Sequence, residues 1–574
     1  MNHSVIEQPR SAQLPAAQQS NKVAWTLRAH SNAQLPLLAW VARTDRLNGI
    51  VTLTHGLRVE VRRSFFIEGV WDGPFHLGEF GTTDCVFGSG GLLTEDSVRF
   101  VPSAATTDHL YYDDADDCVI VSNSLPLLLA HTQDRLDPRC PDYPDICQSI
   151  LNGIHDYRRD IPTTGGKVRR LMYRNLEVSR NQTIELEKQM PPQFTSFAQY
   201  RGYLQDRYGL IAANARDTAR TWPLQIVSTQ SRGYDSTAVN SLARASNLDK
   251  VFTVPTAKSK RSFAHHEEKN LPNDNGEEIC AALDLPCFRI NRRAFVENFD
   301  QEYLYYCALH HNQDANLMDI GNQLSTVSLL LTGVIGEIWR PKADKVEWPC
   351  LNQDLRHGDL GGSGMGEWRL VVGLIHLPLP FIGARRRAEI VEITESPEMD
   401  PWRMRNSYDR PIARRIAEEA GVPRHLFGQS KMGSVVLFSD PSIPYGKALR
   451  REFFDYLVNE KIMIRPTTWF WPVVRWINTT LQVSYLRRVS GIYLMERVLS
   501  KLTGQLVRFP RLWSKLDGTL YCFCVNKTAG RYSSDLRASS EDPSWVSGAA
   551  FNTEETLVKA KDENPFTATT ANVH

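Results

Sequence analysis

The residues whose types and spacing could do chemistry gather in one stretch, LQIVSTQSRGYDSTAVNSLARA, which runs from Leu224 to Ala245. An apolar run ends near Ser228, a polar loop follows, and apolar residues at helical spacing begin after Asp235 or Ser236. The free N–H groups and the partial positive charge at the start of a helix bind anions. The stretch therefore predicts a strand, a loop and a helix that together bind a phosphate group.

Each polar residue of this loop has a chemical use. Ser231 and Ser236 can donate hydroxyl hydrogen bonds, and Gly233 lets the backbone approach a ligand or adopt a positive φ. Asp235 would repel a phosphate, but it suits a hard cation such as Mg²⁺ that bridges phosphate oxygens. The alternative is an ordinary strand–helix turn with an Asp or Ser N-cap. The spacing matches neither the GxxxxGK[ST] loop nor the GxGxxG fingerprint.

The segments around this loop predict an α/β fold. Strand-like apolar runs at Leu224–Val227, Val251–Val254 and Leu329–Leu331 alternate with helical stretches between about Phe197 and Phe438. This alternation indicates an αβα sandwich around a parallel sheet, and such sheets bind phosphates at their carboxyl edge. Upstream, from about Val23 to Leu136, short alternating apolar runs separated by turn residues indicate a β-rich region.

The C-terminal part is predicted to be helical and then disordered. The composition of Pro441–Leu512 is helical, and the CFC at Cys522–Cys524 indicates a buried strand. The polar residues from about Ser533 onward, like those before Val23, are typical of disordered segments. The apolar stretch Thr467–Leu486 is interrupted by charged, amide and proline residues, so we do not expect it to span a membrane.

Composition narrows the classes of function. The chain has 574 residues, which is enough for two or more domains. Lys and Arg number 66 and Asp and Glu 65, so the charge gives no support to nucleic-acid binding. The ten cysteines form no CxxC pair, which favours reduced thiols. The N-terminus lacks the pattern of a secretory signal peptide, and we expect a cytoplasmic protein.

Several segments together resemble one family. SRGYDS, from Ser231 to Ser236, resembles the SGGxDS pyrophosphate loop of the N-type ATP pyrophosphatases, in the asparagine-synthetase-like branch. LLLTGVIGEIW, Leu329 to Trp339, is similar to the second strand and loop of that family, which ends in an acidic metal ligand. GLIHLPLPFIGAR and SYDRPIARRIAEEAGVPRHLFGQSK resemble its late active-site segment, and DHLYYDDADDCVIVSNSLPLLLAH the end of its glutaminase-like domain. These segments cover roughly residues 60 to 435 in the expected order.

The resemblance implies an N-terminal β-rich Ntn-glutaminase-like domain, followed by a HUP-like synthetase domain with extra C-terminal helices. The expected organisation is a disordered segment 1–22, a degenerate glutaminase-like domain 23–190, an ATP pyrophosphatase domain 197–440, a helical extension 441–532 and a disordered tail 533–574.

The resemblance also implies a site for ATP and Mg²⁺. Its nucleotide-binding residues would be Ser231, Arg232, Gly233, Tyr234, Asp235, Ser236, Val254 and Gly333. The catalytic residues would be Asp235 and Glu337, which hold the metal, and Lys431, which contacts the phosphates. Asp274 and Glu277 match an acidic helix start beside the nucleotide, although helix capping explains them equally well.

Three departures from the family bear on activity. Arg232 stands in place of the first Gly of the loop, where it could add a phosphate contact or block the site. The second motif, from Gly333 to Glu337, carries fewer acids than the synthetases do. Glutamine-using members need an N-terminal cysteine as nucleophile, but here the first cysteine is Cys85. We therefore expect glutaminase activity to be lost.

The resemblance implies an ATP-dependent carbon–nitrogen ligase that adenylates a substrate carboxylate, releases pyrophosphate and passes the acyl group to an amine. The carboxylate, on a small molecule or a peptide, and the amine donor stay open. A cyclase of the lasso-peptide or β-lactam-synthetase type, in which the substrate supplies the amine, fits as well. The other alternative is a catalytically inactive homologue that binds a nucleotide or a partner. A partner protein or a homodimer is compatible with the sequence, whereas neither nucleic acid nor a membrane span is expected.

Overall fold

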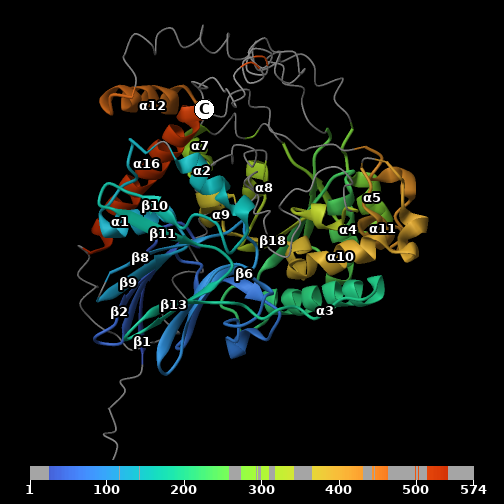
Figure 1. Ribbon diagram of the computed structural model, residues 1–574, viewed down its shortest axis with the longest axis horizontal. Coiled ribbons are helices and arrows are strands. Elements are labelled where there is room, and N and C mark those ends of the chain that lie inside the picture. The colour runs from blue at the N-terminus through green and yellow to red at the C-terminus, as the bar shows by residue number, and fades with distance from the viewer. Residues whose placement is uncertain are drawn as a thin grey trace, which may run out of the picture.

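The computed structural model (Figure 1) places a mainly antiparallel β-sandwich, in which only β1 and β3 among the described strands pair in parallel, beside a parallel-sheet region. The described residues are 25–115, 117–140, 142–256, 273–291, 294, 299–308, 317–341, 365–406, 408–430, 443–444, 446–462, 498, 502 and 514–540. The expectations for 1–22, Lys431 and Thr467–Leu486 lie outside them.

The N-terminal β-rich region consists of two sheets packed face to face. The seven-stranded sheet has the order β1-β3-β2-β9-β8-β11-β10, and the six-stranded sheet has the order β13-β12-β7-β6-β5-β4. The first contains β1 (Thr26–Ser31), β2 (Trp40–Asp45), β3 (Ile50–His55), β8 (Leu110–Asp114), β9 (Cys118–Ser122), β10 (Asp160–Pro162) and β11 (Lys167–Leu171). The second contains β4 (Glu60–Val61), β5 (Phe65–Trp71), β6 (Val86–Leu93), β7 (Ser97–Val101), β12 (Asn175–Ser179) and β13 (Thr183–Leu186). The predicted β-rich region is confirmed.

Aromatic side chains fill the space between the two sheets. The ring of Trp40, on β2, lies edge-on to Phe66 at 5.0 Å and stacks on Phe100 at 6.2 Å. All three are fully buried, as the inward-facing positions of a sandwich require.

The C-terminal region contains a five-stranded parallel sheet of order β16-β15-β14-β17-β18, which confirms the predicted α/β class. Its strands are β14 (Gln225–Gln230), β15 (Lys250–Thr253), β16 (Cys287–Arg289), β17 (Ser328–Thr332) and β18 (Leu374–Pro378). Every residue of β17 and β18 is buried, because helices and the N-terminal sheets cover this part of the sheet. The three apolar runs identified in the sequence all become strands, with bounds shifted by three residues at most.

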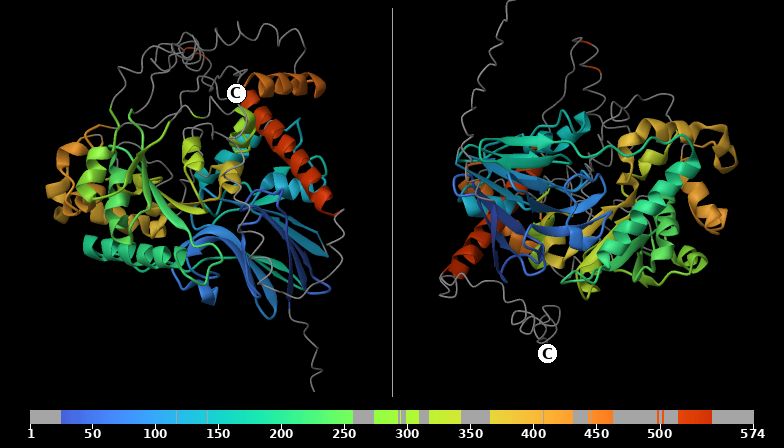
Figure 2. Two further views of the ribbon diagram at one scale, coloured as in Figure 1. Left: turned by 180° about the vertical axis from the view of Figure 1, so that it is seen from behind. Right: turned by 90° about the horizontal axis from the view of Figure 1, so that it is seen from below.

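Helices pack on this sheet and around its edge. α4 (Tyr234–Ala243) packs on β14 and β17, and α11 (Pro411–Glu419) and α3 (Phe197–Ala215) pack on α4. Within the described residues this region also contains α5 (Glu277–Leu283), α7 (Glu302–Tyr305), α8 (Met318–Asn322), α9 (Gly366–Val372) and α10 (Arg387–Glu395). The edge strand β18 contacts β5 and β6, so the two regions lie side by side, as both views of Figure 2 show.

A long C-terminal helix crosses the boundary between the two regions. α16 (Ser514–Ser540) contacts α1 (Leu125–Thr132) of the first region and α7 of the second, and α12 (Lys447–Asn459) packs beside it (Figure 1). Cys522–Cys524 belong to this helix, so the predicted strand is wrong. A short apolar run looks alike in both elements, and it is buried all round here because it lies between two regions. Residues 533–540, expected to be disordered, are helical.

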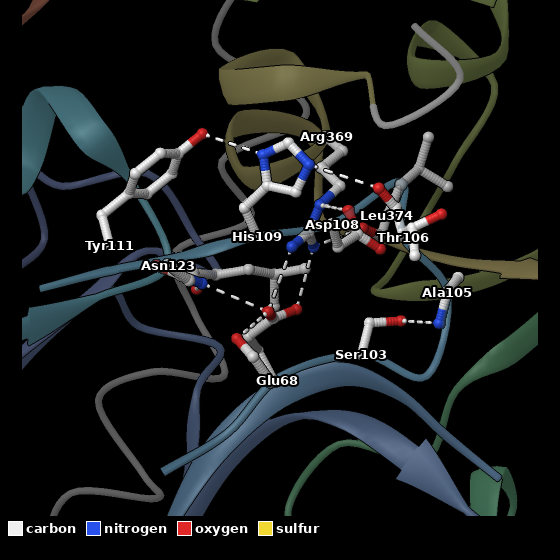
Figure 3. A network of polar contacts seen from close by, with 12 residues as sticks. Glu68, Ser103, Ala105, Thr106, Asp108, His109, Tyr111, Asn123, Arg369 and Leu374 are labelled. Carbon is white, nitrogen blue, oxygen red and sulfur yellow. Dashed lines mark hydrogen bonds and ion pairs between the residues drawn. The ribbon is translucent and has the colours of Figure 1, made fainter. Parts of the chain in front are cut away.

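A buried arginine also joins the two regions. Arg369, on α9, donates from Nη1 and Nη2 to the carboxylate of Glu68 on β5 at 2.9 and 3.2 Å. Its Nε lies 2.9 Å from Oδ1 of Asp108. Figure 3 shows the guanidinium between these two carboxylates. We call Glu68, Arg369 and Asp108 the closed trio, because all three side chains are less exposed than a twentieth of their surface, at 0%, 4% and 3%.

Among the described residues, no helix is both long enough and apolar enough to cross a membrane.

Candidate functional site

The strand order of the parallel sheet reverses between β14 and β17. From β14 the chain adds β15 and β16 on one side, and it then returns to the other side with β17 and β18. The loops after β14 and β17 therefore leave the carboxyl edge next to each other, which is where open α/β sheets bind ligands. The predicted phosphate loop follows β14, and the motif that contains Glu337 follows β17.

The loop after β14 is held together by its own serines. The hydroxyl groups of Ser231 and Ser236 are 2.9 Å apart, and the backbone N–H of Ser231 donates to Oγ of Ser236 at 3.1 Å. Gly233 is the N-cap of α4, and no side chain caps this helix. The positive end of the helix is thus left for another partner, which is the geometry of an anion site.

Two glycines let the loop after β17 lie directly against Asp235. A Cβ atom on Gly333 would come within 2.6 Å of Cβ of Asp235, and one on Gly336 would come closer still to the carboxyl group. Between them Ile335 has a φ of 65°, a left-handed conformation that is unfavourable for a β-branched residue. This strained path brings Glu337, on η7 (Gly336–Trp339), to the start of α4.

Arg410 joins the two predicted metal ligands. Its Nη1 is ion-paired with Oδ1 of Asp235, and its Nη2 donates to Oε1 of Glu337 at 3.2 Å. The side chain of Arg410 is 2% exposed, whereas those of Asp235 and Glu337 are 23% and 36% exposed. Burial lowers the pKa of Arg410 to about 10, so the guanidinium stays charged at neutral pH. We call Asp235, Arg410 and Glu337 the open trio, because its carboxylates reach the surface.

Sequence reasoning missed Arg410. The residue lies within the segment SYDRPIARR, where several arginines look like an ordinary solvated helix face. One signal was present: Arg410 is the N-cap of α11, and a cation at that end opposes the helix dipole. A neighbouring arginine was missed as well. Arg414, one turn along α11, donates from Nη2 to the hydroxyl of Tyr234, the first residue of α4.

Arg232 is anchored away from Asp235. Its Nε donates to the carbonyl of Leu426 at 3.0 Å, and its Nη2 lies 3.4 Å from the carboxylate of Glu278. Its backbone N–H donates to Oδ1 of Asp274 at 2.8 Å, and its carbonyl accepts from the N–H of Gly428. The side chain thus ties the loop to neighbouring segments, and the cation beside Asp235 is Arg410.

The other predicted residues divide into two groups. Asp274 is buried and reaches the phosphate loop through Arg232, and Val254 follows β15 at the same edge of the sheet. Glu277 instead pairs with Arg289 on β16, whose hydrogen bonds lower the pKa of Glu277 to about 2. The N-cap of α5 is Gly276, so the capping interpretation of Asp274 and Glu277 is wrong.

The acidic pair suits a magnesium ion that shares its coordination with a ligand. Asp235 and Glu337 come from different loops and converge on one guanidinium, so a single cation can face both. Mg²⁺ is usually held by one or two carboxylates, with substrate phosphates and water completing the octahedron. Within the described residues there is no cluster of three or more His, Cys, Asp or Glu that could hold a metal alone.

No protein-family model and no curated protein matches this chain. Fold and site together define an α/β protein in which a β-rich region is joined to a five-stranded parallel sheet, with a polar loop and an uncapped helix at the point where the sheet reverses.

Proposed function

We propose that this protein is an ATP-dependent carbon–nitrogen ligase of the asparagine-synthetase type. The observation that carries the proposal is the convergence of Asp235 and Glu337 beside the uncapped N-terminus of α4. A helix N-terminus and a pair of carboxylates attract opposite charges, and a magnesium–polyphosphate complex satisfies both. The Ser231–Ser236 motif and its place after the central strand support the same ligand.

In the proposed reaction a carboxylate oxygen of the substrate attacks the α-phosphorus of ATP, and pyrophosphate leaves. An amine then attacks the acyl carbon and releases AMP. Ser231, Ser236 and the first N–H groups of α4 would bind the leaving pyrophosphate. Mg²⁺, held by Asp235 and Glu337, would supply positive charge to the phosphates when bound. Lys431, by the family resemblance, would add a further cation.

The protein needs no nucleophile of its own for this chemistry. Its task is to align the acid with the nucleotide and to keep water from the acyl-adenylate. Since the β-rich region has no cysteine between Trp25 and Asp84, it would not hydrolyse glutamine through a cysteine nucleophile at its start, and the amine would be ammonia, a group on a partner or a group on the substrate. The last case makes the enzyme a cyclase of the lasso-peptide or β-lactam-synthetase type. A small-molecule or peptide acid, ATP and Mg²⁺ are thus the proposed ligands of a cytoplasmic enzyme.

One observation favours a second candidate, a homologue that binds a nucleotide or a partner without turnover. Arg410 already neutralises Asp235 and Glu337, which weakens their attraction for a metal ion. We prefer the enzyme, because the two carboxylates remain 23% and 36% exposed and can still accept another cation.

ATP–pyrophosphate exchange with a panel of carboxylic acids tests the proposal. We expect exchange with at least one acid, and a loss of about 100-fold or more in Asp235→Asn, the usual cost of removing an electrostatic contact to a developing charge. Glu419→Gln, which alters the ion pairs of Glu419 with Arg415 on α11 and Arg201 on α3, is the control and should leave exchange unchanged. ATP binding without exchange for any acid would point to the non-catalytic homologue instead.

A further inference from the structure

Arg410 occupies the position that a metal ion would need. Its guanidinium contacts two carboxylates from different loops, one after β14 and one after β17. Nη2 of Arg340 also lies 3.9 Å from Oε1 of Glu337, but this arginine is 38% exposed, so solvent weakens its pairing and the carboxylates remain accessible to a cation. Arg410 both holds the carboxylates in place and competes for their oxygens.

The Nε–H group of Arg410 is buried and has no hydrogen-bond acceptor within the described residues. A buried donor without a partner is costly, and the cost falls when an anionic ligand accepts a hydrogen bond from it. Oxygens of a phosphate are suited to a guanidinium, because they accept two parallel N–H groups.

We propose that Arg410 is an exchangeable counter-ion of the nucleotide site. Without ligands it pairs with Asp235 and Glu337, and with ligands it turns its N–H groups to the phosphate oxygens and releases the carboxylates to the metal ion. That the anion is a nucleoside triphosphate rests on the proposed function. The exchange of partners itself needs only a metal ion and a polyphosphate.

The exchange makes the metal and the anion bind cooperatively. The metal alone must compete with Arg410, whereas a bound polyphosphate draws the guanidinium away and frees both carboxylates. By linkage, each ligand then raises the affinity for the other. Replacement of Arg410 by a neutral residue should therefore strengthen binding of the metal alone and weaken binding of the anion alone.

Two titrations of the full chain test this, one with Mn²⁺ alone by electron paramagnetic resonance and one with inorganic tripolyphosphate alone by calorimetry. In Arg410→Gln we expect Mn²⁺ to bind about tenfold more tightly and tripolyphosphate about tenfold more weakly than in the unmodified chain, within the usual range of coupling between sites. Arg410→Lys keeps the charge but not the fork of donors, and it should lie between the two in both titrations.

Arg415→Gln is the matched control, since Arg415 lies on the same helix and also pairs with two carboxylates, Glu398 and Glu419, away from the loop. It should change neither titration. A purely structural role of Arg410 would weaken both ligands in Arg410→Gln, and that result, or unchanged Mn²⁺ affinity, overturns the proposal. If Arg410→Gln does not fold, the same two titrations of Arg410→Lys test the proposal: Mn²⁺ should bind more tightly, and tripolyphosphate more weakly, than in the unmodified chain. The Mn²⁺ titration involves no nucleotide, so its result can be interpreted even if the ATP–pyrophosphate exchange assay contradicts the ligase proposal.

Discussion

In two clusters within the described residues a buried arginine contacts two carboxylates, and the clusters differ in how exposed these carboxylates are. In the closed trio, Ser89 donates to Glu68 at 2.7 Å and Asn123 does so at 3.2 Å, so the carboxylate is satisfied by the protein alone. In the open trio only the arginine is buried, and the carboxylates of Asp235 and Glu337 reach solvent. The closed trio thus holds the two regions of the protein together, whereas the carboxylates of the open trio remain available to a ligand.

The physical difference is the cost of desolvation. A fully buried charge must find its whole set of partners inside the protein, because water cannot compensate a missing one. A carboxylate at the surface can exchange one partner for another at little cost, since water solvates it in between. The closed trio is therefore suited to a fixed joint, and the open trio to a binding site.

The two trios should differ most in how far the free energy of unfolding falls when the arginine is replaced. Arg369→Met leaves Glu68 and Asp108 buried without their cation, and we expect the free energy of unfolding to fall by about 3–5 kcal/mol. Arg410→Met leaves two partly exposed carboxylates, and the loss should be about 1 kcal/mol. Urea unfolding of both variants at pH 7, followed by circular dichroism, measures the difference. Equal losses would show that burial does not distinguish the two clusters.

Asp108 and Glu367, two buried carboxyl groups near Arg369, should contribute to the pH dependence of stability. Burial raises the pKa of Asp108 to about 6, from 3.8, and that of Glu367, which lies two residues before Arg369 on α9, to about 7, from 4.5. Because the folded state holds these protons more tightly, their stabilising effect is complete below the unfolded pKa values and is lost as the pH rises to about 7. We expect the melting temperature to fall between pH 5 and pH 8.

Glu367→Gln isolates the contribution of that residue. The amide oxygen can still accept the hydrogen bond that the hydroxyl of Tyr532 now donates to Glu367 at 3.1 Å, but it cannot ionise. At pH 8 the variant should be more stable than the unmodified chain by about 3 kcal/mol, the equivalent of the pKa shift. Parallel melting profiles of the two proteins across this range would contradict the assignment.

The open trio can be disturbed without any change of charge. Gly336→Ala places a Cβ against the carboxyl group of Asp235, and we expect a loss of about 1–3 kcal/mol from overpacking, together with weaker Mn²⁺ binding. Gly209→Ala is the control, since a Cβ there meets nothing within 4 Å, and in the middle of α3 it should stabilise by about 0.5–1 kcal/mol. Unaltered Mn²⁺ affinity in Gly336→Ala would mean that the contact does not position Asp235.

Much of the scaffold could be predicted, because it depends on patterns that repeat along the chain. Apolar runs separated by helical stretches located the central strands, and the change from SRG to an amphipathic pattern located the start of α4 within two residues. The CFC segment, Cys522–Cys524, shows where the prediction of secondary structure from apolar periodicity fails. Six successive buried residues of α16, Leu520 to Val525, carry no periodicity, since the helix lies between two regions that bury all its sides.

The amino-acid sequence by itself determined the α/β class and the phosphate-loop candidate, whereas the close approach of Gly333 and Gly336 to Asp235 was found only in the structure. Only the tertiary structure decided which charges meet: Arg410 with Asp235 and Glu337, and Arg369 with Glu68 and Asp108. The reason is that secondary structure follows from neighbours in the chain, whereas the partner of a buried charge is set by how distant segments pack, and no local pattern records that distance.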